Sequence, residues 1–172
     1  MKGIYAGTFD PPTLGHYWMI RKGMELFEEL IVAIAVNPTK TPMFKTKERS
    51  SMIEECIVRA EEIFENGYVV RSKASVKIID NQYLIDVASE ESVDHILRGI
   101  RGVQDFPSEI QYYDFNYQKC SYINTVFLIP PPELRHISSS FVKMLIGPEG
   151  WEDEVKKLVI PSVFDHIKNK VK

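Results

Sequence analysis

The stretch Gly7-Thr8-Phe9-Asp10-Pro11-Pro12-Thr13-Leu14-Gly15-His16 predicts the fold of this chain more strongly than any other segment. The apolar run at 4–6 before it is typical of a buried β-strand, and apolar residues recur at helical spacing over 17–27 after it. The segment therefore indicates a strand, a turn rich in glycine and proline, and a helix with His16 in its first turn. A helix N-terminus attracts phosphate, and a histidine there can donate one more hydrogen bond.

Composition and charge exclude several classes of protein. The chain has 172 residues, 44% hydrophobic and 26% charged, which is ordinary for a globular protein. We expect one domain over 1–172, with a helical C-terminal segment from about 148. The net charge of −3 argues against nucleic acid as a partner.

Location is predicted from what the sequence does not contain. No apolar run approaches the roughly 20 residues that a membrane span needs, and no signal peptide is visible. Cys56 and Cys120 lie far apart and have no metal-binding or redox spacing. We therefore expect a cytoplasmic protein with two free thiols and no membrane partner.

Apolar strands alternate with helices along the whole sequence. The predicted strands cover 4–6, 30–36, 68–70 (which 76–79 either continues or follows as a separate strand), 95–97 and 125–129. The predicted helices cover 17–27, Thr46 (as N-cap) to about 64, about 82–91 (capped by Asp80 or Asn81), 107–119, 138–146 and 151–171 with a break at Pro161. This alternation predicts an α/β fold, a doubly wound, Rossmann-like parallel sheet of five strands.

Polar residues follow the ends of the predicted strands. Thr8 follows the first strand and Lys40 the second, while Arg98 and Arg101 follow the fourth. Ligands of a doubly wound sheet bind at the carboxyl ends of its strands, so we expect these side chains to line one crevice. Taken singly, each has a simpler explanation, since Lys40 could be a solvated surface lysine and the arginines could pair with Asp94 or Asp105.

The serine run at 138–140 completes this set after the fifth strand, and it could alternatively serve only as a helix cap. A crevice that combines lysine, arginine and histidine with helix N-termini predicts a site for a polyphosphate and a second anion.

Two levels of family resemblance rest on these residues. The T-x-G-H string at 13–16 is similar to the signature of nucleotidyltransferases related to class I aminoacyl-tRNA synthetases. Over residue 3 to about 143 the chain resembles bacterial phosphopantetheine adenylyltransferases, through the segments 7–11, 40–44, 98–101, 105–106, 109, 116 and 137–143. The resemblance implies transfer of AMP from ATP to 4′-phosphopantetheine, which gives dephospho-coenzyme A and pyrophosphate in coenzyme A biosynthesis.

The resemblance also implies the roles of individual residues. His16 and Lys40 would be catalytic: His16 would stabilise the α-phosphate, and Lys40 would hold the acceptor phosphate or bridge toward the α-phosphate. The acceptor would contact Thr8, Lys40, Leu84 and Arg98. The nucleotide would contact Thr8, Phe9, His16, Gly99, Ile100, Arg101, Glu109, Leu134, Arg135, His136, Ile137, Ser138, Ser139 and Ser140.

Further expectations follow from the family. Mg²⁺ would accompany ATP without a metal site made by the protein, and the chain would assemble as a homohexamer. Dephospho-coenzyme A and coenzyme A would be further ligands. Adenylyl transfer suits the predicted crevice, because the catalyst mainly positions the substrates and neutralises charge, with no covalent nucleophile.

The segment before the predicted acceptor contact departs from the family. The stretch 71–82 is longer than usual and lacks a Gly-Leu segment, and Phe115 stands where a methionine is frequent. Three alternatives therefore stay open: a nucleotidyltransferase acting on another phosphorylated acceptor, a non-catalytic protein that binds nucleotide or coenzyme A, and a tRNA-ligase fragment, which the acidic charge disfavours.

Overall fold

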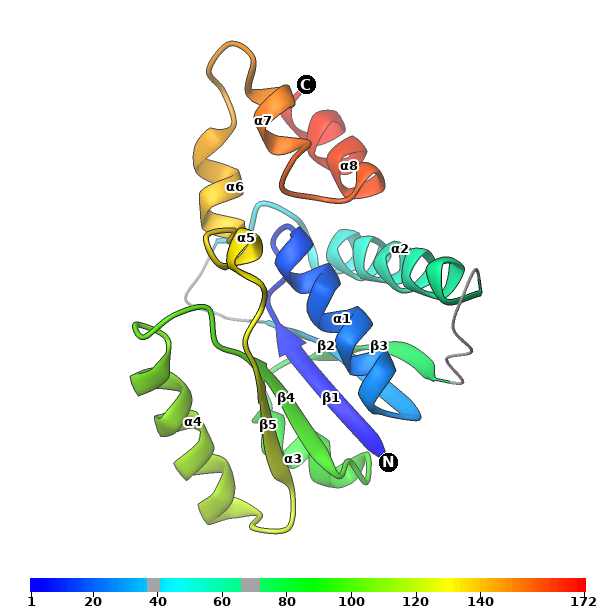
Figure 1. The fold of residues 1–172 in the computed structure, drawn as a ribbon, viewed down its shortest axis with the longest axis vertical. Coiled ribbons are helices and arrows are strands. Elements are labelled where there is room, and N and C mark those ends of the chain that lie inside the picture. Colours follow the sequence, from blue (N-terminus) through cyan, green and yellow to red (C-terminus); the bar gives the residue numbers. More distant parts are fainter. Residues whose placement is uncertain (37–40, 66–71) are drawn as a thin grey trace.

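The computed structural model describes residues 1–36, 41–65 and 72–172, so that Lys40 and the strand predicted at 68–70 lie outside the described residues (Figure 1). Five parallel strands form one sheet: β1 (Lys2–Gly7), β2 (Glu29–Ala35), β3 (Lys73–Ile79), β4 (His95–Gly99) and β5 (Asn124–Leu128). Their order is β3-β2-β1-β4-β5, with β1 paired to β2 on one side and to β4 on the other. This confirms the predicted doubly wound sheet.

Eight helices surround the sheet in the described part of the chain: α1 (Leu14–Leu26), α2 (Thr46–Glu65), α3 (Leu84–Glu90), α4 (Phe106–Lys119), α5 (Pro132–Arg135), α6 (Ser139–Leu145), α7 (Trp151–Val155) and α8 (Pro161–Val171). Among the described residues, none of these helices has the length and apolar character that crossing a bilayer requires.

Two predicted helix caps are wrong. Thr46 is the first residue of α2, and the residue before it, Lys45, has its backbone N–H satisfied by the Glu48 carboxylate at 2.6 Å. Helix α3 is capped by Tyr83, whose carbonyl accepts from the N–H of Val87, and not by Asp80 or Asn81. Asn81 instead has a φ of +55° and turns the chain out of β3 before the helix begins.

The sheet separates two apolar cores because successive strand residues face opposite sides. On β2, Leu30 and Val32 belong to the larger core with residues of α1 and α2, whereas Ile31 and Ala33 face the smaller core with residues of α3. Figure 1 shows α1 and α3 on opposite sides of the strands. The central strands β1, β2 and β4 are therefore buried between the two cores, whereas the edge strands β3 and β5 are mostly half-buried or exposed.

The C-terminal helices share the larger core. Val163 and Ile167 of α8 have no exposed surface and belong to the same cluster as residues of α2. Lys170 donates to Glu48 at 2.9 Å, and its ammonium lies 5.7 Å from the centre of the Phe44 ring. Helix α8 is therefore attached to α2 by a shared apolar core and, at the first turn of α2, by the ion pair between Lys170 and Glu48.

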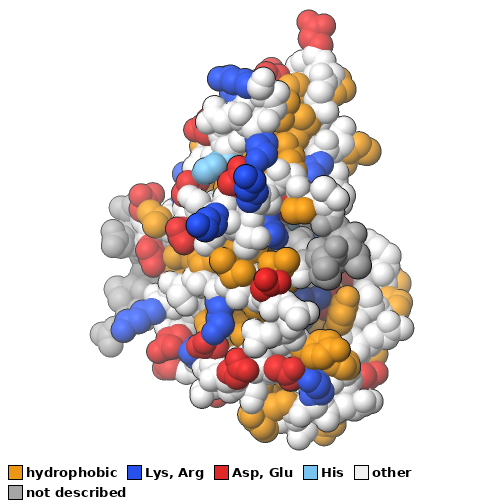
Figure 2. All heavy atoms as spheres, turned by 180° about the vertical axis from the view of Figure 1, so that it is seen from behind, with side chains coloured by type: hydrophobic (Ala, Val, Ile, Leu, Met, Phe, Trp, Pro, Cys, Tyr) orange, Lys and Arg blue, Asp and Glu red, His pale blue; other side chains and the backbone are white. Residues whose placement is uncertain are grey.

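Helix α4 is attached differently from the others. Glu109 is its only buried residue, and its aromatic side chains at 112, 113, 115 and 117 are exposed. Lys119 pairs with Asp86 of α3 at 2.8 Å. Figure 2 shows exposed hydrophobic side chains among charged ones over the α3–α4 half of the molecule.

The packing of α8 predicts a measurable loss of stability. We expect Ile167→Ala to lower the free energy of unfolding by about 2–5 kcal/mol, because it leaves a cavity in a core shared with α2. Lys168→Ala, an exposed change one residue further along α8, is the control, and we expect an effect within about 0.5 kcal/mol. Urea unfolding followed by circular dichroism measures both; equal midpoints for the two variants would contradict the shared core.

Candidate active site

The turn between β1 and α1 brings three aromatic rings into contact. Phe9 has a φ of +49°, and its fully buried ring lies 5.5 Å from that of Tyr5 and 5.1 Å from that of His16, measured between ring centres. Phe9 was predicted to contact the nucleotide. Since its side chain is enclosed in the core, only its backbone could face a ligand, and its ring packs edge-on against the imidazole of His16.

The start of α1 fixes which nitrogen of His16 carries a proton. The backbone N–H of Thr13 donates to Nδ1 of His16 at 3.0 Å, and the Thr13 hydroxyl lies at the same distance. A backbone N–H can only donate, so Nδ1 accepts and the proton of the neutral imidazole is on Nε2. His16 is therefore a ready hydrogen-bond donor at the N-terminus of a long helix.

The surroundings keep this imidazole neutral. Burial and the positive charge of Arg101 lower the pKa of His16 from its ordinary 6.5 to about 4. At neutral pH the Nε2–H group can therefore donate to a phosphate oxygen while the imidazole is uncharged. A protonated His16 would be repelled by the positive charge of Arg101.

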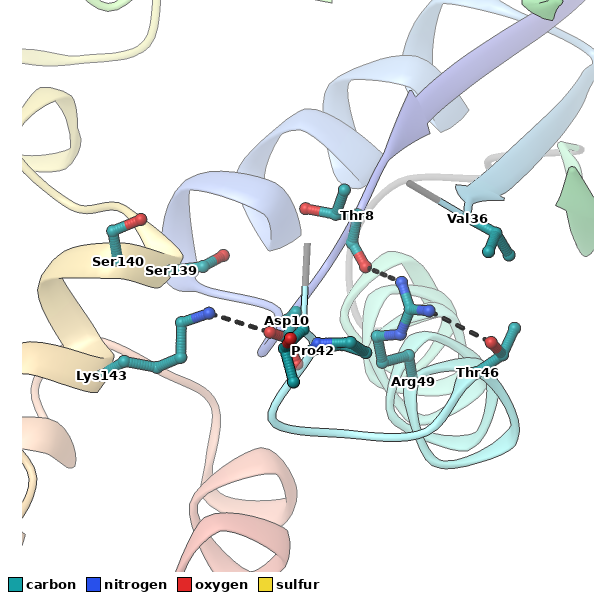
Figure 3. Close-up of a pocket in the computed structure, with 10 residues that line it drawn as sticks. Thr8, Asp10, Val36, Pro42, Thr46, Arg49, Ser139, Ser140 and Lys143 are labelled. Carbon is teal, nitrogen blue, oxygen red and sulfur yellow. Dashed lines mark hydrogen bonds and ion pairs between the residues drawn. The ribbon is translucent and has the colours of Figure 1, made fainter. Parts of the chain in front are cut away.

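A polar cavity of about 500 Å³ opens beside this turn (Figure 3). It is lined by Thr8, Asp10, Val36, Thr41, Pro42, Thr46, Arg49, Ser139, Ser140 and Lys143. The side chains of α6 approach from one side, the 41–49 segment from the other, and the β1–α1 turn lies between them. Two cations and several hydroxyl groups make the cavity suitable for an anion with many oxygens.

A second, aromatic cavity of about 640 Å³ begins at the same strand end. Its lining comprises Ala6, Gly7, Thr8, Ala35, Gln82, Tyr83, Leu84, Arg98, Glu109, Gln111, Tyr112, Tyr113, Phe115, Asn116 and Thr125. Thr8 lines both cavities, so they meet at the end of β1. The structure thus brings together three of the predicted acceptor residues, Thr8, Leu84 and Arg98.

Arg98 and Glu109 form a two-pronged ion pair in the aromatic cavity. Nε and Nη2 of Arg98 each donate to one carboxylate oxygen of Glu109 at 2.7 Å, and the Tyr112 ring centre lies 5.4 Å from the guanidinium carbon. Burial alone would lower the pKa of Arg98, but Glu109 outweighs it and raises that pKa. Glu109, which was predicted to contact the nucleotide, here pairs with the predicted acceptor residue Arg98, and its contact with the nucleotide stays a prediction.

The other predicted nucleotide residues line two further hollows or lie against α1. Ile100, Arg101 and Arg135 line one hollow of about 480 Å³, and Leu134, His136 and Ile137 line another of about 470 Å³. Gly99 lies against Met19 of α1, as a Cβ added to Gly99 would be 3.3 Å from the Met19 sulfur. A Cβ added to Gly15 would lie 3.8 Å from the carbonyl of Leu134, so the 134–137 segment passes directly beside the residue before His16.

The simpler explanations considered for the arginines and for the serine run, ion pairing and helix capping, are partly confirmed. Arg101 pairs with Asp105 at 3.0 Å, as one alternative foresaw, whereas Arg98 pairs with Glu109. Ser138 does cap α6, because its hydroxyl accepts from the N–H of Phe141 at 3.1 Å. Ser139 and Ser140 both line the polar cavity, but the Ser139 hydroxyl donates to the carbonyl of Pro11 at 2.8 Å.

Sequence reasoning missed Arg49, which is only 3% exposed. Nη1 of Arg49 donates to the carbonyl of Thr8 at 2.6 Å, and Nη2 donates to the Thr46 hydroxyl at 3.1 Å. The sequence contains a signal for this residue: position 49 is spaced at helical intervals from the apolar positions 52, 53 and 56, which places the arginine on the buried face of the helix. Arg49 therefore fixes the backbone of the residue shared by both cavities.

Comparison with known proteins adds independent findings. Residues 4–145 match the family model described as Cytidylyltransferase-like. The chain is 40% identical over 166 residues to the phosphopantetheine adenylyltransferase of Neisseria meningitidis serogroup C, covering 96% of this chain and 91% of that one. It is 39% identical to the protein of the same name from Chromobacterium violaceum, covering 95% and 93% of the two chains.

Solved structures agree on the fold. The Plasmodium falciparum nicotinic acid mononucleotide adenylyltransferase complexed with APC superposes with a TM-score of 0.65 at 17% identity, covering 98% of this chain and 94% of that chain. At this level of identity the likeness supports the architecture alone.

The environment of His16 predicts its titration. In the protein without ligands we expect the imidazole to titrate with a pKa of about 4 and to carry its proton on Nε2 at neutral pH. Since an unfolded histidine takes up its proton near pH 6.5, the folded state should lose stability as the pH falls from about 6.5 to 4. Nitrogen-15 NMR of the imidazole measures its pKa and shows which ring nitrogen carries the proton. A pKa near 6.5, or a proton on Nδ1, would contradict the geometry.

The contacts of Arg49 predict its importance for Thr8. We expect Arg49→Met to lower the free energy of unfolding by about 1–3 kcal/mol, because it removes the side-chain hydrogen bond to the half-buried carbonyl of Thr8. Lys47→Met, an exposed change in the same turn of α2, is the control and should be nearly neutral. Denaturant unfolding compares the two, and a neutral Arg49→Met would show that its hydrogen bonds contribute little.

Proposed function

The chain belongs to the cytidylyltransferase-like family and, within it, to the phosphopantetheine adenylyltransferases, and we propose that it transfers AMP from ATP to 4′-phosphopantetheine. The products are dephospho-coenzyme A and pyrophosphate, so the reaction is a step of coenzyme A biosynthesis. The observation that carries the proposal is the neutral Nε2–H group of His16, whose pKa the charge of Arg101 helps to lower. The imidazole lies 5.1 Å from the ring of Phe9, and Phe9 directly follows Thr8, the residue that lines both cavities.

The reaction is a direct displacement at the α-phosphorus. A phosphate oxygen of the acceptor forms a bond to this phosphorus, while the bond to the oxygen that bridges the α- and β-phosphates breaks and pyrophosphate leaves. Negative charge on the α-phosphate must be stabilised as the bonds exchange. The Nε2–H group of His16 donates to a non-bridging oxygen there, and Lys40, which lies outside the described residues, supplies a positive charge.

The two cavities suit the two substrates. The polar cavity offers the hydroxyl groups of Thr8 and Ser140 to phosphate oxygens, and Arg101 outside it supplies a guanidinium for the β- and γ-phosphates. The aromatic cavity would take the acceptor arm against Leu84. Because Glu109 occupies only Nε and Nη2 of Arg98, Nη1 is left to bind the acceptor.

Mg²⁺ fits as a companion of ATP. Among the described residues, no group of three or more His, Cys, Asp or Glu side chains could hold a metal ion. The carboxylate in the polar cavity, Asp10, already accepts from two backbone N–H groups and from Lys143. We therefore propose that Mg²⁺ is held by phosphate oxygens, where it would neutralise part of the triphosphate charge.

The uncovered face of α4 supports assembly into a homohexamer. Exposed apolar and aromatic side chains on one helix are typical of subunit interfaces, and Ile110 and Tyr117 of α4 are exposed without lining the aromatic cavity. We further propose that the protein acts in the cytoplasm as a single domain and that dephospho-coenzyme A and coenzyme A bind in the same two cavities.

The test is pyrophosphate release from ATP and Mg²⁺ with four acceptors: 4′-phosphopantetheine, pantetheine, nicotinic acid mononucleotide and glycerol 3-phosphate. We expect release with 4′-phosphopantetheine only. His16→Ala should lower kcat by on the order of 10²–10³, the usual loss when one transition-state donor is removed. His166→Ala, whose imidazole belongs to α8 and pairs with Glu55 of α2, should keep normal turnover.

Other outcomes discriminate among the alternatives. Release with a different acceptor would assign the chain to another nucleotidyltransferase activity. Tight ATP binding without any release would indicate a non-catalytic nucleotide-binding protein. Full activity in His16→Ala would contradict the role given to the imidazole.

A further inference from the structure

Asp10 joins three separate segments of the chain through one buried carboxylate. Its Oδ1 accepts from the N–H of Phe44 at 2.8 Å, and its Oδ2 accepts from the N–H of Met43 at 3.0 Å and from Nζ of Lys143 at 2.9 Å. The carboxylate side chain is 8% exposed, whereas that of Lys143 is 35% exposed. Figure 3 shows the Lys143 ammonium directed from α6 toward Asp10.

These three segments are the walls of the polar cavity. The turn after β1 contributes Thr8 and Asp10, the 41–46 segment contributes Thr41, Pro42 and Thr46, and α6 contributes the two serines and Lys143. Lys143 follows Ser139 by four residues, so the two side chains share one face of α6. The Ser139 hydroxyl also donates to the carbonyl of Pro11 at 2.8 Å, which adds a second tie between α6 and the turn. The separation of the walls is therefore set largely by Asp10.

The charges of the pair depend on each other. Burial alone would raise the pKa of Asp10, but Lys143 and the two backbone N–H groups outweigh burial and lower that pKa. The carboxylate is thus ionised at neutral pH, and Lys143 is the cation that contacts it directly. Arg49 faces the same cavity but directs its hydrogen bonds to Thr8 and Thr46.

We propose that Asp10 and Lys143 are a positioning pair for adenylyl transfer. They fix the distance between Ser140 of α6, whose hydroxyl would bind a nucleotide phosphate, and the 41–46 segment on the opposite wall. In-line displacement requires the two substrates to meet within a narrow range of geometry, and a displacement of about 1 Å can cost on the order of a hundredfold in rate. The inference rests on the proposed function, and neither side chain is required to touch the reacting atoms.

Four variants test the pair: Lys143→Met, Lys143→Arg, Asp10→Asn, and the double variant Asp10→Asn/Lys143→Met. We expect Lys143→Met to lower kcat by about tenfold to a hundredfold, with KM for ATP and for the acceptor changed by less than about threefold. Lys143→Arg should recover most of the rate because it keeps the charge. The double variant should lose no more than the worse single variant, since the two residues act as one unit.

The matched control is Lys156→Met, which removes an exposed lysine of the C-terminal segment that pairs with Asp153. It should behave like the wild type. Thermal unfolding of every variant is recorded, and the kinetics are measured at a temperature where each is folded. Wild-type kcat in Lys143→Met would overturn the proposal. A raised KM for ATP with unchanged kcat would overturn it as well, because Lys143 would then be a binding residue.

A second readout does not depend on turnover. If Lys143 holds Asp10 in place, Lys143→Met should speed hydrogen exchange at the Met43 and Phe44 amides by at least about fivefold, while exchange in the core of β1 stays the same. Unchanged exchange at these two amides would overturn the positioning role. A wild-type protein that is inactive with 4′-phosphopantetheine would instead overturn the proposed function. Failure of the positioning proposal and failure of the proposed function therefore give different results.

Discussion

The hydrogen bond from the backbone N–H of Thr13 to Nδ1 of His16 is the interaction on which the site depends. It satisfies a backbone donor that the first turn of α1 leaves unpaired, and it also sets the proton of the imidazole on Nε2. Phe9 supports the ring from the core, and burial with the charge of Arg101 keeps it neutral. The hydrogen bond that caps the start of α1 thus also orients the Nε2–H group of His16 as a hydrogen-bond donor for a phosphate oxygen before any ligand binds.

The parallel sheet brings the remaining groups to this donor. Because β1 lies between β2 and β4, the segments that leave the carboxyl ends of these strands share one edge. Thr8 stands at the end of the central strand and lines both cavities, and Arg49 holds its carbonyl from α2. The buried carboxylate of Asp10 then ties the turn to the two walls of the polar cavity.

Much of this arrangement could be predicted from the sequence, because strand periodicity and the motif at 7–16 are local signals. The five-stranded sheet, the Ser138 cap of α6 and the position of Arg98 at a strand end followed from them. The pairing of Arg98 with Glu109 could not be predicted from local signals, because it depends on how α4 packs relative to β4. The cap of α3 was misplaced because the turn at Asn81, with its positive φ, delays the helix so that Tyr83 is its N-cap and Leu84 its first residue. The roles of Asp10 and Arg49 depend on contacts with segments distant in the sequence.

The most direct test is a crystal structure of the protein with a non-hydrolysable ATP analogue and 4′-phosphopantetheine. The account predicts a non-bridging α-phosphate oxygen within about 2.7–3.2 Å of Nε2 of His16, while Nδ1 still accepts from Thr13. It further predicts the triphosphate against Ser139 and Ser140 and the acceptor arm against Leu84. An α-phosphate placed away from His16, or an imidazole turned so that Nδ1 faces the ligand, would contradict it.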